Sequence, residues 1–130
     1  MRIAISGTSC QGKSTLVKDF LEQWPSYTTP EKTYRDIIAE NNLEHSSKTN
    51  KETQRKILDF QIEEQQKYRN GDNVLFDRCP LDNLVYSMWA CEQEGNDIDE
   101  EFVSSCLPLV RESFRNLDII FFVPITKVAP

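Results

Sequence analysis

The sequence predicts a three-layer α/β fold in which a parallel sheet is flanked by helices. Strand-like and helix-like segments alternate along the chain, an order typical of parallel strands joined by helical crossovers. Apolar residues run without alternation through residues 73–77 and 118–123, as expected of strands that are covered on both faces. The 130 residues, of which 38% are apolar and 28% charged, indicate one domain over residues 1–130 with a core of its own.

The first half of the chain is expected to form two strands and two helices. Residues 2–6 indicate the first strand, and residues 26–29 indicate a short second one. A helix over residues 31–41 and a polar loop over residues 42–50 should follow. The helix between the two strands is marked by apolar residues at helical spacing: Leu16, Val17, Phe20, Leu21 and Trp24.

The second half is expected to contain three helices around the two apolar strands. A long helix over residues 52–69 should end at Asn70-Gly71, which is a good C-cap. The helix that follows residue 98 should kink or restart at Pro108, because proline lacks the backbone N–H. Between these two, a helix over residues 81–94 should bury one apolar face: Leu81, Leu84, Val85, Met88 and Trp89.

The core is predicted from the bulkiest apolar residues. The strand over residues 118–123 is expected to be fully buried, because its apolar run is unbroken. Trp24, Trp89 and Phe102 are expected to pack in the core rather than to stack on a ligand.

Residues 7–14 fit the pattern G-x-x-x-x-G-K-[ST], with Gly7, Gly12, Lys13 and Ser14 at the specified positions. The segment lies between a predicted strand and a predicted helix, which is the context of a phosphate-binding loop. We expect Lys13 to contact the β and γ phosphates of ATP and the Ser14 hydroxyl to bind Mg2+. The predicted ATP-binding set is Gly7, Cys10, Gln11, Gly12, Lys13, Ser14 and Thr15.

Asp77 and Arg78 follow an apolar strand at the edge where ligands collect in open α/β sheets. Asp77 can hold Mg2+ through water or accept a proton, and Arg78 can bind phosphate with its two-donor fork. A plain salt bridge at the strand end is the alternative. The predicted catalytic residues are Lys13, Asp77 and Arg78, and the predicted metal ligands are Ser14 and Asp77.

Charge and cysteine usage narrow the classes of partner. A net charge of -6 argues against a nucleic-acid polymer or an anionic membrane as the main partner, and favours a small-molecule substrate. The four cysteines, Cys10, Cys79, Cys91 and Cys106, have no zinc-like spacing, so free thiols in a cytoplasmic protein are expected. A homodimer is left open.

Residues 77–86 carry a resemblance to known kinases. Their D-R-x motif with a later Tyr86 resembles thymidylate kinases and deoxynucleoside kinases, whose version begins E-R-S. The D-R-x-P-x-D run is even more similar to phage and bacterial P-loop kinases related to nicotinamide riboside kinases. The resemblance implies that Arg78 binds the acceptor phosphate or orients the reacting oxygen, and that Asp77 works with Mg2+ or as a base.

The acceptor side is predicted partly from the same resemblance. It implies that Glu31 and Arg35 face the acceptor, although a solvated first helical turn explains Glu31 equally well. Gln61 and Gln65 lie near one face of the long helix, where carboxamides can bind the edge of a nucleobase, as a glutamine does in deoxynucleoside kinases. A partly exposed polar helix is the alternative. The predicted acceptor-binding set is Glu31, Arg35, Gln61, Gln65, Arg78 and Tyr86.

The sequence therefore favours a P-loop kinase that transfers the γ-phosphoryl group of ATP to a nucleoside or nucleoside monophosphate, with a deoxynucleotide acceptor preferred. A nicotinamide riboside type kinase is the first alternative. The second is a P-loop ATPase or nucleotide-sensing module without a small-molecule acceptor. Asp77-Arg78 favours the kinase, because it complements the phosphate loop.

The resemblance also implies a lid with arginines, a helix and a further strand after residues 118–123. Lys127 is the only cation after Val123. We therefore expect this chain to be the N-terminal part of a longer kinase that lacks its lid and last strand, and to turn over slowly alone.

Overall fold

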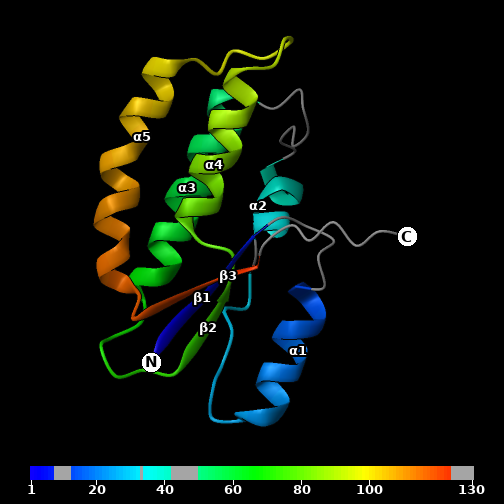
Figure 1. The fold of residues 1–130 in the computed structure, drawn as a ribbon, viewed down its shortest axis with the longest axis vertical. Helices are drawn as coiled ribbons and strands as arrows, with labels where there is room; N and C mark the ends of the chain where they lie inside the picture. Colours follow the sequence, from blue (N-terminus) through cyan, green and yellow to red (C-terminus); the bar gives the residue numbers. More distant parts are fainter. Residues whose placement is uncertain (8–12, 33, 42–49, 124–130) are drawn as a thin grey trace.

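The computed structural model describes residues 1–7, 13–32, 34–41 and 50–123, and the elements follow the predicted alternation (Figure 1). The strands and helices are β1 (Arg2–Gly7), α1 (Lys13–Gln23), α2 (Tyr34–Asn41), α3 (Lys51–Gln66), β2 (Val74–Asp77), α4 (Pro80–Cys91), α5 (Glu100–Ser113), the 3-10 helix η1 (Phe114–Asn116) and β3 (Ile119–Val123).

The three strands form one parallel sheet in the order β2-β1-β3. Ile3 of β1 is in register with Leu75 of β2 on one side and with Ile119 of β3 on the other. The predicted short strand over residues 26–29 is reduced to a single bridge between Thr28 and Val74. The parallel sheet predicted from the alternating elements is thus confirmed.

Helices cover both faces of the sheet (Figure 1). Val17, Phe20 and Leu21 of α1 pack on one face, against Ile3, Ile5 and Leu75. On the other face Ala4 and Phe76 belong to a second cluster, against which Leu81 of α4 packs. The helices α3, α4 and α5 share a cluster of their own: Leu58, Leu84, Cys106 and Val110.

The buried face of α4 differs from the predicted apolar one. Val85 is 55% exposed and Met88 and Trp89 also face outward, whereas Asn83, Ser87 and Ala90 are buried with Leu84. Small and polar residues let α4 lie close to its neighbours, and Asn83 Nδ2 donates a 2.9 Å hydrogen bond to the carbonyl oxygen of Gln54 on α3. The position of the neighbouring helices, not hydrophobicity, decided which face is buried.

Two further core predictions are wrong. Trp24 is 54% exposed, at the end of α1, where Phe20 provides its ring contact. The strand predicted to be fully buried, β3, leaves Phe121 and Phe122 exposed, because it pairs only with β1 at the edge of the described sheet. Phe102 is half-buried against the cluster of α3, α4 and α5.

The helix α5 runs through Pro108 without restarting, and the predicted alternative, a kink at Pro108, stays a prediction. Proline removes the hydrogen bond to the carbonyl oxygen of Ser104. Both residues are exposed, so water can take the place of the missing N–H. None of the helices in the described ranges is both long and apolar enough to cross a membrane.

Candidate functional site

The candidate site begins where β1 and β2 end side by side. Asp77 is the last residue of β2, and the next backbone N–H, that of Arg78, donates a 2.8 Å hydrogen bond to the carbonyl oxygen of Ile5. Ile5 lies two residues before the end of β1, which leads into the predicted phosphate loop. Parallel pairing thus brings the two sequence motifs to one edge of the sheet.

Arg78 has an unusual backbone. Its φ of 77° lies in the left-handed region, and it is the only non-glycine residue with positive φ among those that the structure describes. For a residue with a Cβ this conformation costs about 1–2 kcal/mol, and such strain clusters at functional sites. Arg78 is therefore a functional candidate on its conformation as well as on its charge.

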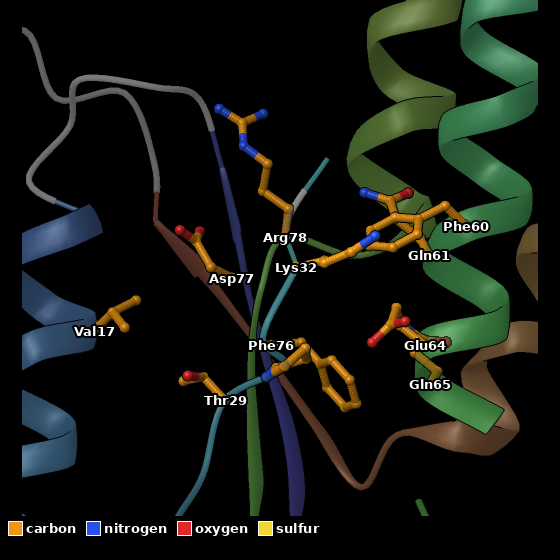
Figure 2. Close-up of a pocket in the computed structure, with 11 residues that line it drawn as sticks. Val17, Thr29, Lys32, Phe60, Gln61, Glu64, Gln65, Phe76, Asp77 and Arg78 are labelled. Carbon is orange, nitrogen blue, oxygen red and sulfur yellow. The ribbon is translucent and has the colours of Figure 1, made fainter. Parts of the chain in front are cut away.

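A cavity of about 180 Å³ opens beside this turn. Figure 2 shows Val17 of α1 on one side, residues of α3 on the other, and Asp77 and Arg78 between them at the end of β2. The lining residues are Val17, Thr29, Pro30, Lys32, Phe60, Gln61, Glu64, Gln65, Phe76, Asp77 and Arg78. The rings of Phe60 and Phe76 provide apolar surface. The polar lining residues of α3, namely Gln61, Glu64 and Gln65, form a polar wall.

Three polar atoms of the α3 wall, on Gln61 and Gln65, lack hydrogen-bond partners in the described part of the chain. Gln65 is only 1% exposed, and neither its Oε1 nor its Nε2 has a hydrogen-bond partner there. Gln61 Oε1 is buried and unpartnered as well. A buried polar group without a partner costs about 1–3 kcal/mol, so each such group calls for a ligand or an ordered water. Here the groups line a cavity that can hold either.

Two charged residues of the lining, Lys32 and Glu64, pair with residues outside it. Lys32 Nζ lies 2.8 Å from Glu40 Oε1, and the hydrogen bond and charge of Glu40 raise the pKa of Lys32. Glu64 pairs in the same way with Lys67, at 2.5 Å. Both pairs are at the rim of the site, where solvent screens their charges.

Cys79, next to Arg78, is not a nucleophile. Burial raises the pKa of its thiol to about 12, and the Asp82 carboxylate adds to this. A thiol with so high a pKa carries almost no thiolate at neutral pH. Cys79, Cys91 and Cys106 are all free, which agrees with the predicted free thiols for the described cysteines.

The phosphate loop itself lies largely outside the described residues. Cys10, Gln11 and Gly12 fall in the segment 8–12, and of Lys13 and Ser14 only the backbone, at the start of α1, is described. Thr15 is exposed on the first turn of this helix. The predicted contacts of these residues with ATP and Mg2+ stay predictions.

Gly7 is required by a contact that the sequence did not reveal. Its φ is 143°, and a Cβ at this position would lie 2.6 Å from the carbonyl oxygen of Val123 on β3. The glycine therefore lets β1 and β3 approach at the point where the loop begins.

The structure brings together four of the predicted site residues: Gln61, Gln65, Asp77 and Arg78. Glu31 is exposed and is not among the lining residues, and the side chain of Arg35 lies outside the description. Tyr86 lies on α4 outside the lining, with its ring 5.6 Å from that of Trp89, and burial raises its pKa. The acceptor roles of these three stay predictions.

Sequence reasoning missed several lining residues. Phe60 and Glu64 lie beside Gln61 and Gln65 at a spacing of four residues, a signal that could have identified them. Thr29 and Lys32 come from the connection after α1, whose path no local pattern predicts. Asp82 was part of the quoted motif but received no role, although it contacts both β1 and the start of α4.

Comparisons with known proteins agree with this fold. Residues 2–127 match a family described as AAA domain. The NadR protein, solved in complex with NR, is similar with a TM-score of 0.71 and 16% identity over 96% of this chain. The deoxyadenosine kinase of M. mycoides is similar in two structures, with TM-scores of 0.67 and 0.57 and identities of 18% and 20%, each over 97% of this chain.

These similarities cover only part of the solved proteins. The chain spans 33% of the NadR chain and 65–66% of the two deoxyadenosine kinase chains. Among curated proteins, none matches this sequence significantly. At such identities the solved structures support only the fold, which is a P-loop α/β fold. The chemistry has to be inferred from the residues of the cavity.

Proposed function

We propose that this chain, which belongs to the AAA-domain family, transfers the γ-phosphoryl group of ATP to a nucleoside or nucleoside monophosphate, with a deoxynucleotide acceptor preferred. The observation that carries the proposal is the cavity beside Arg78, whose α3 wall holds the unpartnered carboxamide of Gln65 and the unpartnered Oε1 of Gln61. Buried polar groups of this kind are the donors and acceptors that a small polar acceptor would satisfy.

In the proposed reaction, ATP and the acceptor bind on opposite sides of the ends of β1 and β2. ATP binds over residues 7–14, with Lys13 on its β and γ phosphates, and the acceptor occupies the cavity. Arg78 lies between them, where its guanidinium can bind the acceptor phosphate or the transferred group in two-donor fashion. Catalysis then rests on holding the two reactants in line and on neutralising charge.

The Asp77 carboxylate fits a magnesium site or a general base. It lines the cavity at the end of β2, and carboxylate oxygens are ligands that Mg2+ prefers. Mg2+ would neutralise the charge of the transferring phosphate, and Asp77 and Ser14 would hold it. Asp77 could alternatively accept the proton of the attacking hydroxyl.

The unpartnered atoms of the α3 wall favour a base with an exocyclic amino group. Gln65 offers one acceptor and one donor, and Gln61 offers a second acceptor. The amino group of adenine or cytosine has two N–H bonds for the two acceptors, and an adjacent ring nitrogen can accept from Gln65 Nε2. Thymine, with one ring N–H, leaves an acceptor unpaired. The deoxyadenosine kinase structures contain dCMP and dATP, both of which carry such a base.

Two other functions have specific support. The similarity to NadR in complex with NR favours a nicotinamide riboside type kinase, and the carboxamide of nicotinamide riboside also carries an amino group. The description of the family as AAA domain favours an ATPase or nucleotide-sensing module without a small acceptor. We further propose a single domain over residues 1–130 and a cytoplasmic location.

One assay separates these functions. ADP release from ATP and Mg2+ is measured with deoxyadenosine, deoxycytidine, deoxyguanosine, thymidine, their monophosphates and nicotinamide riboside, and with no acceptor. We expect stimulation by the adenine or cytosine compounds and little by thymidine. Stimulation by nicotinamide riboside alone selects the first alternative. ADP release that no acceptor changes selects the second.

A further inference from the structure

The side chain of Asp82 joins the two halves of the proposed site. Its Oδ1 accepts hydrogen bonds from Ser6 Oγ at 3.0 Å and from the backbone N–H of Gly7 at 2.8 Å. Its Oδ2 accepts from the backbone N–H of Cys79 at 2.9 Å. Ser6 and Gly7 end β1, Gly7 is the first residue of the predicted phosphate loop, and Cys79 follows Arg78 directly.

Helix capping explains only one of these three bonds. The bond from Cys79 lies at the N-terminus of α4, where a carboxylate in the first turn is favourable. The bonds from Ser6 and Gly7 come from a strand and contribute nothing to the helix end. The donors Ser6 and Cys79 are buried, at 2% and 1% exposed, and the charge-assisted bonds to the half-buried Asp82 are only partly accessible to water.

Two hydrogen bonds fix the backbone at the strained Arg78 and directly after it. Arg78 is held in its left-handed conformation by its own bond to Ile5, while Asp82 holds the next residue, Cys79, and ties it to Gly7. The start of the phosphate loop and the backbone that carries Arg78 therefore share one carboxylate.

We infer that Asp82 is a positioning residue, which sets the place of Arg78 relative to the phosphate loop. The inference rests on the proposed function, because its consequence is the alignment of ATP with the acceptor. Replacing the carboxylate by a carboxamide places an NH2 group where a carboxylate oxygen accepts, so either the bonds from β1 or the bond from Cys79 is lost. Since a displacement of about 1 Å can cost about 100-fold in rate, we expect Asp82→Asn to lower kcat at least about tenfold.

The kinetic test compares Asp82→Asn with Asp99→Asn. Asp99 caps α5 with the same kind of bond, 2.8 Å from the N–H of Phe102, but its carboxylate accepts from Phe102 and Lys51 rather than from β1 or Cys79. We expect both variants to stay folded, with the larger loss of thermal stability in Asp82→Asn, because its carboxylate accepts three part-buried bonds whereas the cap by Asp99 is exposed. Only Asp82→Asn should lower kcat, with the KM values for ATP and acceptor changed less than about threefold, because binding groups remain in place. Equal kcat values for the two variants would overturn the inference.

A double substitution tests whether Asp82 acts through Arg78. If it does, Asp82→Asn should lower kcat much less in an Arg78→Ala background than in the wild type, because the group being positioned is already gone. An independent, multiplicative loss of activity would contradict this and assign Asp82 a purely structural role.

A measurement without turnover separates this inference from the proposed function. In the wild type, ATP and Mg2+ should shift the amide NMR resonances of both Gly7 and Cys79, because Asp82 links them. In Asp82→Asn the shift at Cys79 should disappear. Transfer to no acceptor together with these shifts would reject the kinase but keep the link. A Cys79 shift that survives in the variant would overturn the link, and so would a wild type in which ATP shifts the resonance of Gly7 but not that of Cys79.

Discussion

The backbone N–H of Arg78 is 2.8 Å from the carbonyl oxygen of Ile5, and this bond places a left-handed arginine between the ends of two parallel strands. The arginine thus occupies a position where glycine would be more stable. The cost is tolerated at the point where the predicted phosphate loop and the cavity meet. Replacing Arg78 is therefore expected to affect the stability of the fold differently from the activity.

Arg78→Ala and Arg78→Gly should be equally inactive but unequally stable. Loss of the guanidinium should lower turnover at least about 100-fold while ATP affinity stays nearly unchanged. Arg78→Gly should be about 1 kcal/mol more stable than Arg78→Ala, because glycine has no strain at positive φ. Denaturant unfolding and steady-state kinetics measure the two effects. ATP binding that weakens as much as turnover would instead assign Arg78 to the donor side.

Lys13→Ala should abolish transfer and most of the affinity for ATP. A cation that contacts two phosphates in a partly desolvated loop has no substitute nearby. Lys18→Ala is the matched control, because Lys18 is exposed on the same helix. Isothermal titration with ATP and Mg2+ measures both variants. Equal affinities in the two would reject the phosphate-loop assignment.

Gln65→Leu should stabilise the fold while weakening the acceptor site. Removing a buried carboxamide without partners should raise the free energy of unfolding by about 1 kcal/mol or more. The KM for the acceptor should rise at least about tenfold if this group binds the base. Gln66→Leu is the control, because Gln66 is the exposed neighbour on α3 and should change neither quantity. A stabilised Gln65→Leu with unaltered KM would remove Gln65 from the acceptor site.

Gly7→Ala should be far more destabilising than Gly95→Ala. Both glycines have positive φ, but a Cβ on Gly7 would meet the carbonyl oxygen of Val123 at 2.6 Å, whereas nothing lies within 4 Å of one on Gly95. We expect about 2–5 kcal/mol for Gly7→Ala and about 1–2 kcal/mol for Gly95→Ala. Urea unfolding gives both values. Similar losses of stability in the two variants would mean that β3 moves to relieve the contact between the new Cβ and Val123.

Cys79 should resist alkylation in the folded protein. Burial raises the pKa of its thiol from the ordinary 9.0 to about 12, so at pH 8 the reactive thiolate is scarce. Iodoacetamide followed by peptide mass analysis should label the half-exposed Cys91 before the buried Cys79 and Cys106. Because folding raises this pKa, the contribution of Cys79 to stability is present below pH 9 and is lost as the pH rises toward 12. Rapid labelling of Cys79 at pH 8 would contradict its burial.

The sequence by itself determined the order of the elements and the places of the two motifs. Unbroken apolar runs such as residues 73–77 predict buried parallel strands, and a polar pair after such a run must lie at the carboxyl edge of the sheet. Asp77 and Arg78 were found in this way. The spacing of Gln61 and Gln65 likewise placed both on one face of α3, because helical periodicity is local.

Only the tertiary structure decided which surfaces meet. The buried face of α4 is made of Asn83, Ser87 and Ala90 rather than Val85 and Met88, because burial depends on how closely a neighbouring helix approaches. Lys32 lines the cavity because the connection that follows α1 passes beside it. Asp82 and Gly7 are 75 residues apart, and a hydrogen bond over that separation exists only once the sheet has brought their elements together.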